Sequence, residues 1–133
     1  MSRHLERDLD RLKKDVLEMG GLVERAIRRA MAALDERRTD YAQEVIDGDD
    51  AIDAREVEVE EECLKVLALH QPVAGDLRFL IAILKVNNDL ERMGDEAHNI
   101  AERAAYLASI DPISAPPGLP LMLHRVRAMV QSS

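Results

Sequence analysis

Acidic side chains gather on one face of the segment 39–69. At about 100° per residue, four of them fall within about 60° of one another on a helix: Asp49, Asp53, Glu56 and Glu60. Asp49 and Glu56 lie on the apolar seam itself, which continues as Val45 before them and Cys63 after them. Like charges one turn apart repel, and no lysine or arginine lies on this stretch of the face. A bound cation would relieve that repulsion, so we predict a metal site here.

A second polar stripe occurs in the segment 73–109. Its members recur at helical spacing: Asn88, Glu91, Asp95, His98 and Glu102. A carboxylate three residues before a histidine, as in Asp95 and His98, recurs in metal-carboxylate bundles. The stripe lies about 110° from the centre of the apolar seam expected for this segment, so we expect it on the flank of the helix.

The register of the two segments places their acids at one level. If the chain turns near Gln71, Glu91 and Asp95 lie at the height of Asp49 and Asp53 on the neighbouring antiparallel helix. We therefore predict one metal site or a small cluster, with these ligands: Asp49, Asp53, Glu56, Glu91, Asp95 and His98. Oxygen ligands suit magnesium, calcium or manganese, and a histidine also admits iron or zinc. We predict no catalytic residue.

Solvation is the competing explanation for both stripes. Charged residues make up 33% of the chain, so acids four residues apart also arise by chance on exposed helix faces. That explanation is stronger for the second stripe, because the first one interrupts an apolar seam. His98 alone fits a surface histidine, and Cys63 fits a small core residue.

Three long periodic segments would position these residues. The first, 5–34, has apolar residues alternating at spacings of four and three. The second runs over 39–69, with Thr39 and Asp40 as N-caps, and the third over 73–109. Its seam is expected to be Phe79, Ile83, Val86, Leu90, Met93, Ala97, Ile100, Ala104 and Leu107. Short connections between long helices predict an all-α, up-down-up antiparallel three-helix bundle over 5–110.

Glycine and proline mark the remaining features. Gly20 and Gly21 interrupt the first segment at a cost of about 1 kcal/mol each, so we expect a neighbouring helix to come close there. The stretch 111–118 contains three prolines and is expected to be a linker. An amphipathic pattern over 119–133 predicts the start of a fourth helix.

Composition limits the partners and the compartment. The 133 residues carry 18 basic and 26 acidic side chains, a net charge of −8, which disfavours nucleic acid and favours a cation or a basic partner. Apolar residues make up 47% and aromatic ones 2%. The single cysteine suits a reducing compartment, and no signal peptide or membrane span is expected. A cytoplasmic location is expected.

Two strings resemble the signature of the PhoU family. They are HQPVAGDLR at 70–78 and LERMGD at 90–95, and the pairs Asp49-xxx-Asp53 and Glu91-xxx-Asp95 match a further motif of that family. The resemblance covers about residues 5–110. It implies a three-helix bundle that binds divalent or iron-type metal clusters and is not an enzyme. It also implies repression of phosphate-starvation signalling, through a phosphate ABC transporter and its sensor histidine kinase, with membrane association only through those partners.

One departure from that family is expected to matter. Its members typically carry two tandem bundles, whereas this sequence shows one bundle and the opening of another from Leu119. The chain is therefore either a piece of a two-repeat protein or a single repeat that forms a homodimer.

Two other functions stay open from the sequence. A metal-carboxylate bundle with a redox or metal-storage role would need a water-excluded site, usually built from four helices. A histidine phosphotransfer bundle would use His98 as acceptor, but Asp95 and Glu102 would repel a phosphoryl group.

Overall fold

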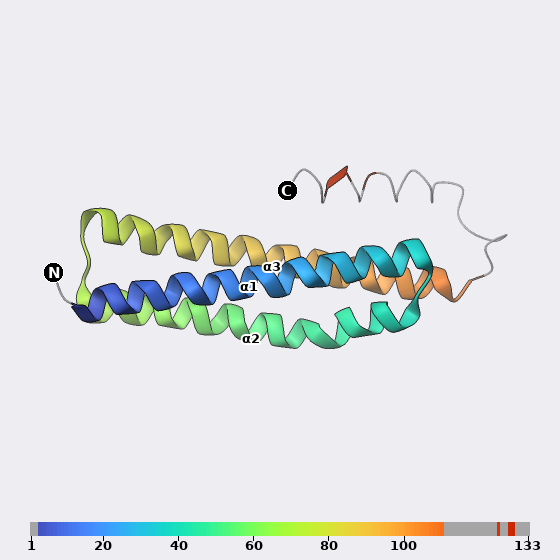
Figure 1. The fold of residues 1–133 in the computed structure, drawn as a ribbon, viewed down its shortest axis with the longest axis horizontal. Coiled ribbons are helices and arrows are strands. Elements are labelled where there is room, and N and C mark those ends of the chain that lie inside the picture. Colours follow the sequence, from blue (N-terminus) through green and yellow to red (C-terminus); the bar gives the residue numbers. More distant parts are fainter. Residues whose placement is uncertain (1–2, 111–124, 126–127, 130–133) are drawn as a thin grey trace. The chain divides into compact units, whose positions relative to one another are not determined.

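A computed structural model describes residues 3–110, 125 and 128–129 (Figure 1). They form the helices α1 (Arg3–Glu36), α2 (Thr39–His70) and α3 (Ala74–Ala108), with no strand among them. The predicted all-α, up-down-up three-helix fold is confirmed, and each helix ends within two residues of its expected position. The predicted linker, 111–118, and most of the predicted fourth helix lie outside the described residues.

Residues with positive φ end two of the helices. Arg37 follows α1 with a φ of 54°, and Gln71 follows α2 with a φ of 45°. This left-handed conformation stops a helix, and Pro72 cannot continue one. Arg37 also donates from Nη2 to the carbonyl oxygens of Leu107 (2.8 Å) and Ile110 (2.7 Å). It therefore caps the carboxyl end of α3, whose last carbonyls lack partners within the helix.

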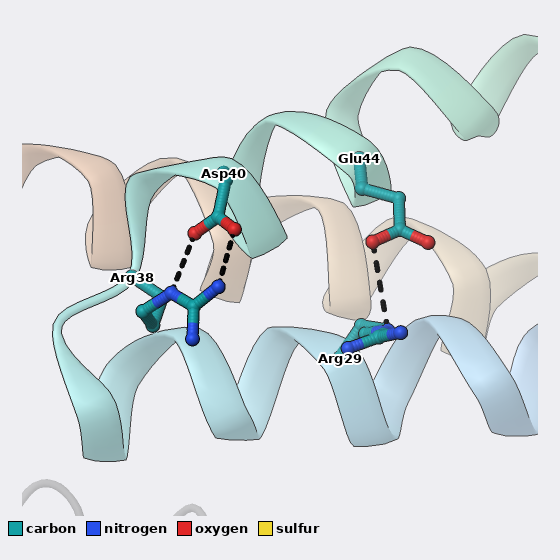
Figure 2. Close-up of polar contacts among 4 residues, drawn as sticks. All are labelled: Arg29, Arg38, Asp40 and Glu44. Atoms are coloured by element: carbon teal, nitrogen blue, oxygen red, sulfur yellow. Dashed lines mark hydrogen bonds and ion pairs between the residues drawn. The ribbon is translucent and has the colours of Figure 1, made fainter.

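A polar cluster fixes the first turn of α2 (Figure 2). Arg38 donates to both carboxylate oxygens of Asp40, at 2.8 and 2.6 Å, and Arg29 lies 3.5 Å from Glu44. Both guanidinium groups also pack on the ring of Tyr41, at 4.1 and 4.5 Å from its centroid. The hydrogen bond from Arg38 lowers the pKa of Asp40. Because these side chains are exposed to solvent, the pairs contribute little to the stability of the fold.

The helices form two compact units. One comprises Met1–Glu24 and Asp50–Gly94. Its core is made of leucine, valine, isoleucine and cysteine: Leu5, Leu9, Leu12, Val59, Cys63, Val66, Leu80 and Ile83. Cys63 is fully buried, and burial raises the pKa of its thiol to about 11. This burial confirms the prediction that Cys63 is a core residue. A thiol that stays protonated is also a poor nucleophile.

The other unit comprises Arg25–Asp49 and the described part of Asp95–Ser133. Its core is dominated by small side chains: Ile27, Ala30, Ala33, Leu34, Ala42, Val45, Ala97, Ile100, Ala101, Ala104 and Leu107. Small side chains in a core allow helix axes to approach closely.

The expected seam of α3 is wrong in part of its first half, although Ile83 is buried as predicted. The structure buries Leu80, Asn87 and Gly94, whereas Val86 is 44% exposed and Phe79 is only half-buried. Asn87 is 1% exposed, and its Nδ2 donates to the backbone oxygen of Glu56 at 3.0 Å. This hydrogen bond lets a polar residue occupy the core. The buried face is consequently rotated toward the acidic stripe of α3.

The close approach expected at Gly20 and Gly21 is also wrong. A Cβ atom at either position would meet nothing within 4 Å. The tight glycine is Gly94, where a Cβ would lie 3.2 Å from Ile52 Cγ2 and 3.9 Å from Val23 Cγ2. Helix packing in this unit therefore depends on Gly94.

Alanine substitutions at Gly20 and Gly94 should change the free energy of unfolding in opposite directions. Gly20→Ala should raise the free energy of unfolding by about 0.5–1 kcal/mol, because it only removes the cost of glycine in a helix. Gly94→Ala should lower it by about 1–2 kcal/mol, because the short buried branch of Ile52 must move. Urea unfolding of both variants would measure the difference. Equal stabilisation by both substitutions would contradict the packing described at Gly94.

Candidate metal site

Helix α2 positions the first two acids of the candidate site. Asp49 and Asp53 are both half-buried, and a carboxylate oxygen of each lies within 4.8 Å of the other. They lie one turn apart on the face that buries Val45 and Ile52. The Asp49 side chain is 18% exposed. The acids therefore intrude on the buried face of α2, as the sequence predicted.

Helix α3 supplies the third carboxylate. Asp95 is exposed, and one of its oxygens lies within 4.8 Å of a carboxylate oxygen of Asp49. The register argument placed these two residues at one level, and the structure brings them together. Two donor atoms bound to one ion at about 2.0–2.2 Å lie no more than about 4.4 Å apart. Small side-chain rotations would therefore suffice for a shared cation.

His98 extends this group through Asp49. Its Nδ1 lies 3.6 Å from Asp49 Oδ2, and its Nε2 is paired with Glu102 Oε1 one turn later on α3. Nδ1 is buried and has no hydrogen-bond partner among the described residues. A buried imidazole nitrogen without a hydrogen bond, beside carboxylates, has the donor chemistry of a metal ligand. The residues present thus fit the metal that the sequence led us to expect.

Glu56 and Glu91 lie outside the aspartate group. Glu56 is half-buried, and desolvation is the main cause that raises its pKa. The negative charge of Glu60, a side-chain hydrogen bond with Glu60 and the charge of Asp53 raise it further. Glu91 is half-buried on α3. Their roles as metal ligands stay predictions, and the raised pKa of Glu56 is evidence of a strongly negative local field.

Arg55 lies in this part of α2 but points its charge elsewhere. Its guanidinium pairs with Glu18 of α1 and, at 3.5 Å, with Glu58 one turn later. The cation nearest in sequence to the acidic face is thus committed to other carboxylates.

Glu102 lies on the polar stripe of α3 but was not among the predicted ligands. The spacing of four residues from His98 was the available signal, because side chains four apart on a helix are neighbours.

None of the three described helices combines the length and apolar character needed to cross a lipid bilayer.

The chain is similar to known proteins of one family. The PhoU domain model matches residues 16–104. The "Phosphate-specific transport system accessory protein PhoU homolog" of Aquifex aeolicus is 46% identical over 129 residues, which are 97% of this chain and 58% of that protein. The protein of the same description from Deinococcus radiodurans is 42% identical over 132 residues, or 99% of this chain and 62% of that one.

A solved structure shows the same fold. The crystal structure of PhoU from Pseudomonas aeruginosa superposes with a TM-score of 0.81 at 38% identity, over 95% of this chain and 61% of that one. The chain spans about three fifths of the length of these relatives. With the family match over most of the described helices and these identities over nearly the whole chain, the protein belongs to the PhoU family.

Proposed function

We propose that this chain is a regulatory module of phosphate uptake that represses phosphate-starvation signalling. The observation that carries the proposal is the identity of 46% with a protein described as an accessory of the phosphate-specific transport system. The role is that of a binding module, because the described site offers carboxylates and an imidazole of the kind that hold a cation.

The proposed metal site uses the residues that the sequence indicated, and the geometry ranks them. Asp49, Asp53 and Asp95 form its centre, His98 joins through Asp49, and Glu56 and Glu91 are outer contributors. Magnesium, manganese, iron and zinc are the proposed ions, and they would neutralise charge on the buried face of α2. Bound metal would thereby stabilise the helix surfaces that a partner recognises.

The proposed partners are a sensor histidine kinase and the components of a phosphate ABC transporter. The net charge of −8 favours basic protein surfaces and disfavours nucleic acid. We place the protein in the cytoplasm, at the membrane only through these partners, and as a homodimer.

A reporter strain tests the regulatory role. In a bacterium that lacks its own PhoU-family protein, a phosphate-starvation reporter should stay active in high phosphate. Expression of the full chain should reduce reporter output by about tenfold, which is within the range typical of regulatory coupling. Asp49→Asn/Asp95→Asn should leave the reporter active at equal protein level, because it removes two central carboxylates.

Gly20→Ala is the matched control, since Gly20 lies on α1, which supplies none of the proposed ligands, and a Cβ atom there would meet nothing within 4 Å. It should repress like the parent chain. Full repression by the double variant would remove the metal site from the regulatory role. No repression by the parent chain would contradict the role itself.

A further inference from the structure

We propose that the outer face of α1 is an interface with a second copy of this chain, with the two α1 helices antiparallel about a two-fold axis. This surface, the outer stripe, consists of six exposed residues: Asp10, Lys13, Leu17, Gly21, Glu24 and Arg28. The inference rests on the homodimer proposed above and names the surface that forms it. None of the proposed metal ligands belongs to α1.

The outer stripe runs along α1 on the side that faces away from the core. Its members recur at spacings of three and four residues, so they lie within about 80° of one another on the helix. The most deeply buried large residues of the same part of α1 are Leu12, Met19 and Val23, about 140° away. Because α1 is continuous over Arg3–Glu36, the stripe is uninterrupted for about 27 Å.

Leu17 is the large apolar residue of the outer stripe. Its side chain is 66% exposed, so a partner that covers it would remove apolar surface from water. A single exposed leucine is common on protein surfaces and needs no partner by itself. The residues around Leu17 are what distinguish it.

Gly21 follows Leu17 by one turn and serves no purpose inside the chain. A Cβ atom at Gly21 would meet nothing within 4 Å, and no glycine of the chain has a positive φ. Glycine inside a helix is less favourable than alanine, and here neither packing nor backbone conformation requires it. On a helix surface a glycine leaves a hollow that can receive a side chain of another helix. Leu17 of a second copy has the shape and polarity to fill that hollow.

An antiparallel two-fold arrangement makes the outer stripe complementary to itself. In such an interface residue i of one copy faces residue j of the other, and j faces i. If Leu17 faces Gly21 of the second copy, the two residue numbers add to 38. The same sum places Asp10 opposite Arg28, and Lys13 opposite Glu24 to within one residue.

This register brings every charged member of the stripe against an opposite charge. Each contact occurs twice, because the axis repeats it. A parallel pair of α1 helices would instead place each charge beside its own copy, which is repulsive. The pattern of charges therefore selects the antiparallel pair.

Two bordering residues limit the strength of this contact. Lys14 and Arg25 are exposed beside the stripe, and the same register brings these two positive charges near each other. Both side chains are long and can extend into solvent, away from each other. We therefore expect a weak and reversible dimer, of the kind that small interfaces form.

Sedimentation equilibrium of the full chain tests the interface. The parent should form particles of twice its mass of 14.9 kDa. Lys13→Glu and Glu24→Lys should each raise the dissociation constant of the dimer by about tenfold or more, because each brings two pairs of like charges together. Lys65→Glu is the matched control, since Lys65 is an exposed lysine of α2 outside the stripe. It should dimerise like the parent.

A mixture of the two charge-reversed variants gives the most specific measurement. In a mixed dimer of Lys13→Glu with Glu24→Lys, both pairs again join opposite charges. The mixture should therefore dimerise like the parent, although neither variant does so alone. This recovery would also show that both variants are folded. A mixture that stays monomeric would overturn the two-fold arrangement.

The outcomes separate this interface from the homodimer and from the regulatory role. If the parent and both variants dimerise equally well, the homodimer stands and uses another face, so the outer stripe fails. If the parent stays monomeric across the concentrations measured, both the outer stripe and the homodimer fail. The reporter strain then still tests the regulatory role on its own.

Discussion

Asn87→Asp should lower the free energy of unfolding by about 3–5 kcal/mol at neutral pH, because it places an unpaired charge in the core. Asn87 is 1% exposed, and its Nδ2 donates to the backbone oxygen of Glu56 at 3.0 Å. An aspartate of the same shape would turn a second oxygen toward that carbonyl. Asn87 Oδ1 is itself buried without a hydrogen-bond partner among the described residues. The site therefore offers no donor to the new charge.

The destabilisation caused by Asn87→Asp should depend on pH. A buried carboxyl group has a pKa above its unfolded value of about 3.9, because burial disfavours the charged form. The destabilisation is thus complete above the folded pKa and disappears as the pH falls toward the unfolded value. Protonation also restores a donor for the carbonyl oxygen of Glu56. Stability of the variant relative to the parent should accordingly improve between about pH 8 and pH 4.

Asn88→Asp is the matched control for chemical denaturation across that pH range. Asn88 is the next residue of α3 and is exposed, so the same change in charge should alter stability by less than about 0.5 kcal/mol. Equal loss in the two variants would show that Asn87 does not occupy the core as described.

Asn87 also explains where the sequence misled us about the fold. The helix boundaries were predictable, because Thr39, Gln71 and Pro72 are local signals that act on their own backbone. The seam of α3 was not, because apolar residues lie on both flanks of its first half. Choosing between those flanks required knowing that Asn87 finds a carbonyl acceptor on α2, and no local pattern contains that fact.

The candidate site likewise has features that the sequence could predict and features that it could not. The level of Asp49 and Asp95 followed from counting residues back from the turn, since two adjacent antiparallel helices share one register. The pairing of His98 with Glu102 and the open space beside Gly20 and Gly21 depend on rotamers and on helix rotation. A hydrophobic pattern fixes the rotation of a helix only to within a fraction of a turn.

Asp49→Asn/Asp95→Asn should have opposite effects on the metal-free and metal-loaded protein. In the presence of a chelator, the double variant should unfold at a higher temperature than the parent. Its free energy of unfolding should be higher by about 0.5 kcal/mol, because a like-charge contact is removed. Zinc at 100 times its dissociation constant should stabilise the parent by about 2.7 kcal/mol and the variant hardly at all. Thermal unfolding with and without zinc measures both effects.

A control of equal charge isolates the site from the general acidity of the chain. Asp10→Asn/Glu96→Gln also removes two negative charges, from exposed positions of α1 and α3. With this control, zinc stabilisation should match that of the parent, because the net charge of −8 sets only a weak and salt-screened attraction for ions. Stabilisation lost equally in both double variants would mean that zinc responds to net charge. Stabilisation lost only in Asp49→Asn/Asp95→Asn would mean that zinc binds at this particular arrangement of carboxylates. The repulsion measured in the chelator would then be the free-energy cost of holding these carboxylates together in the metal-free protein.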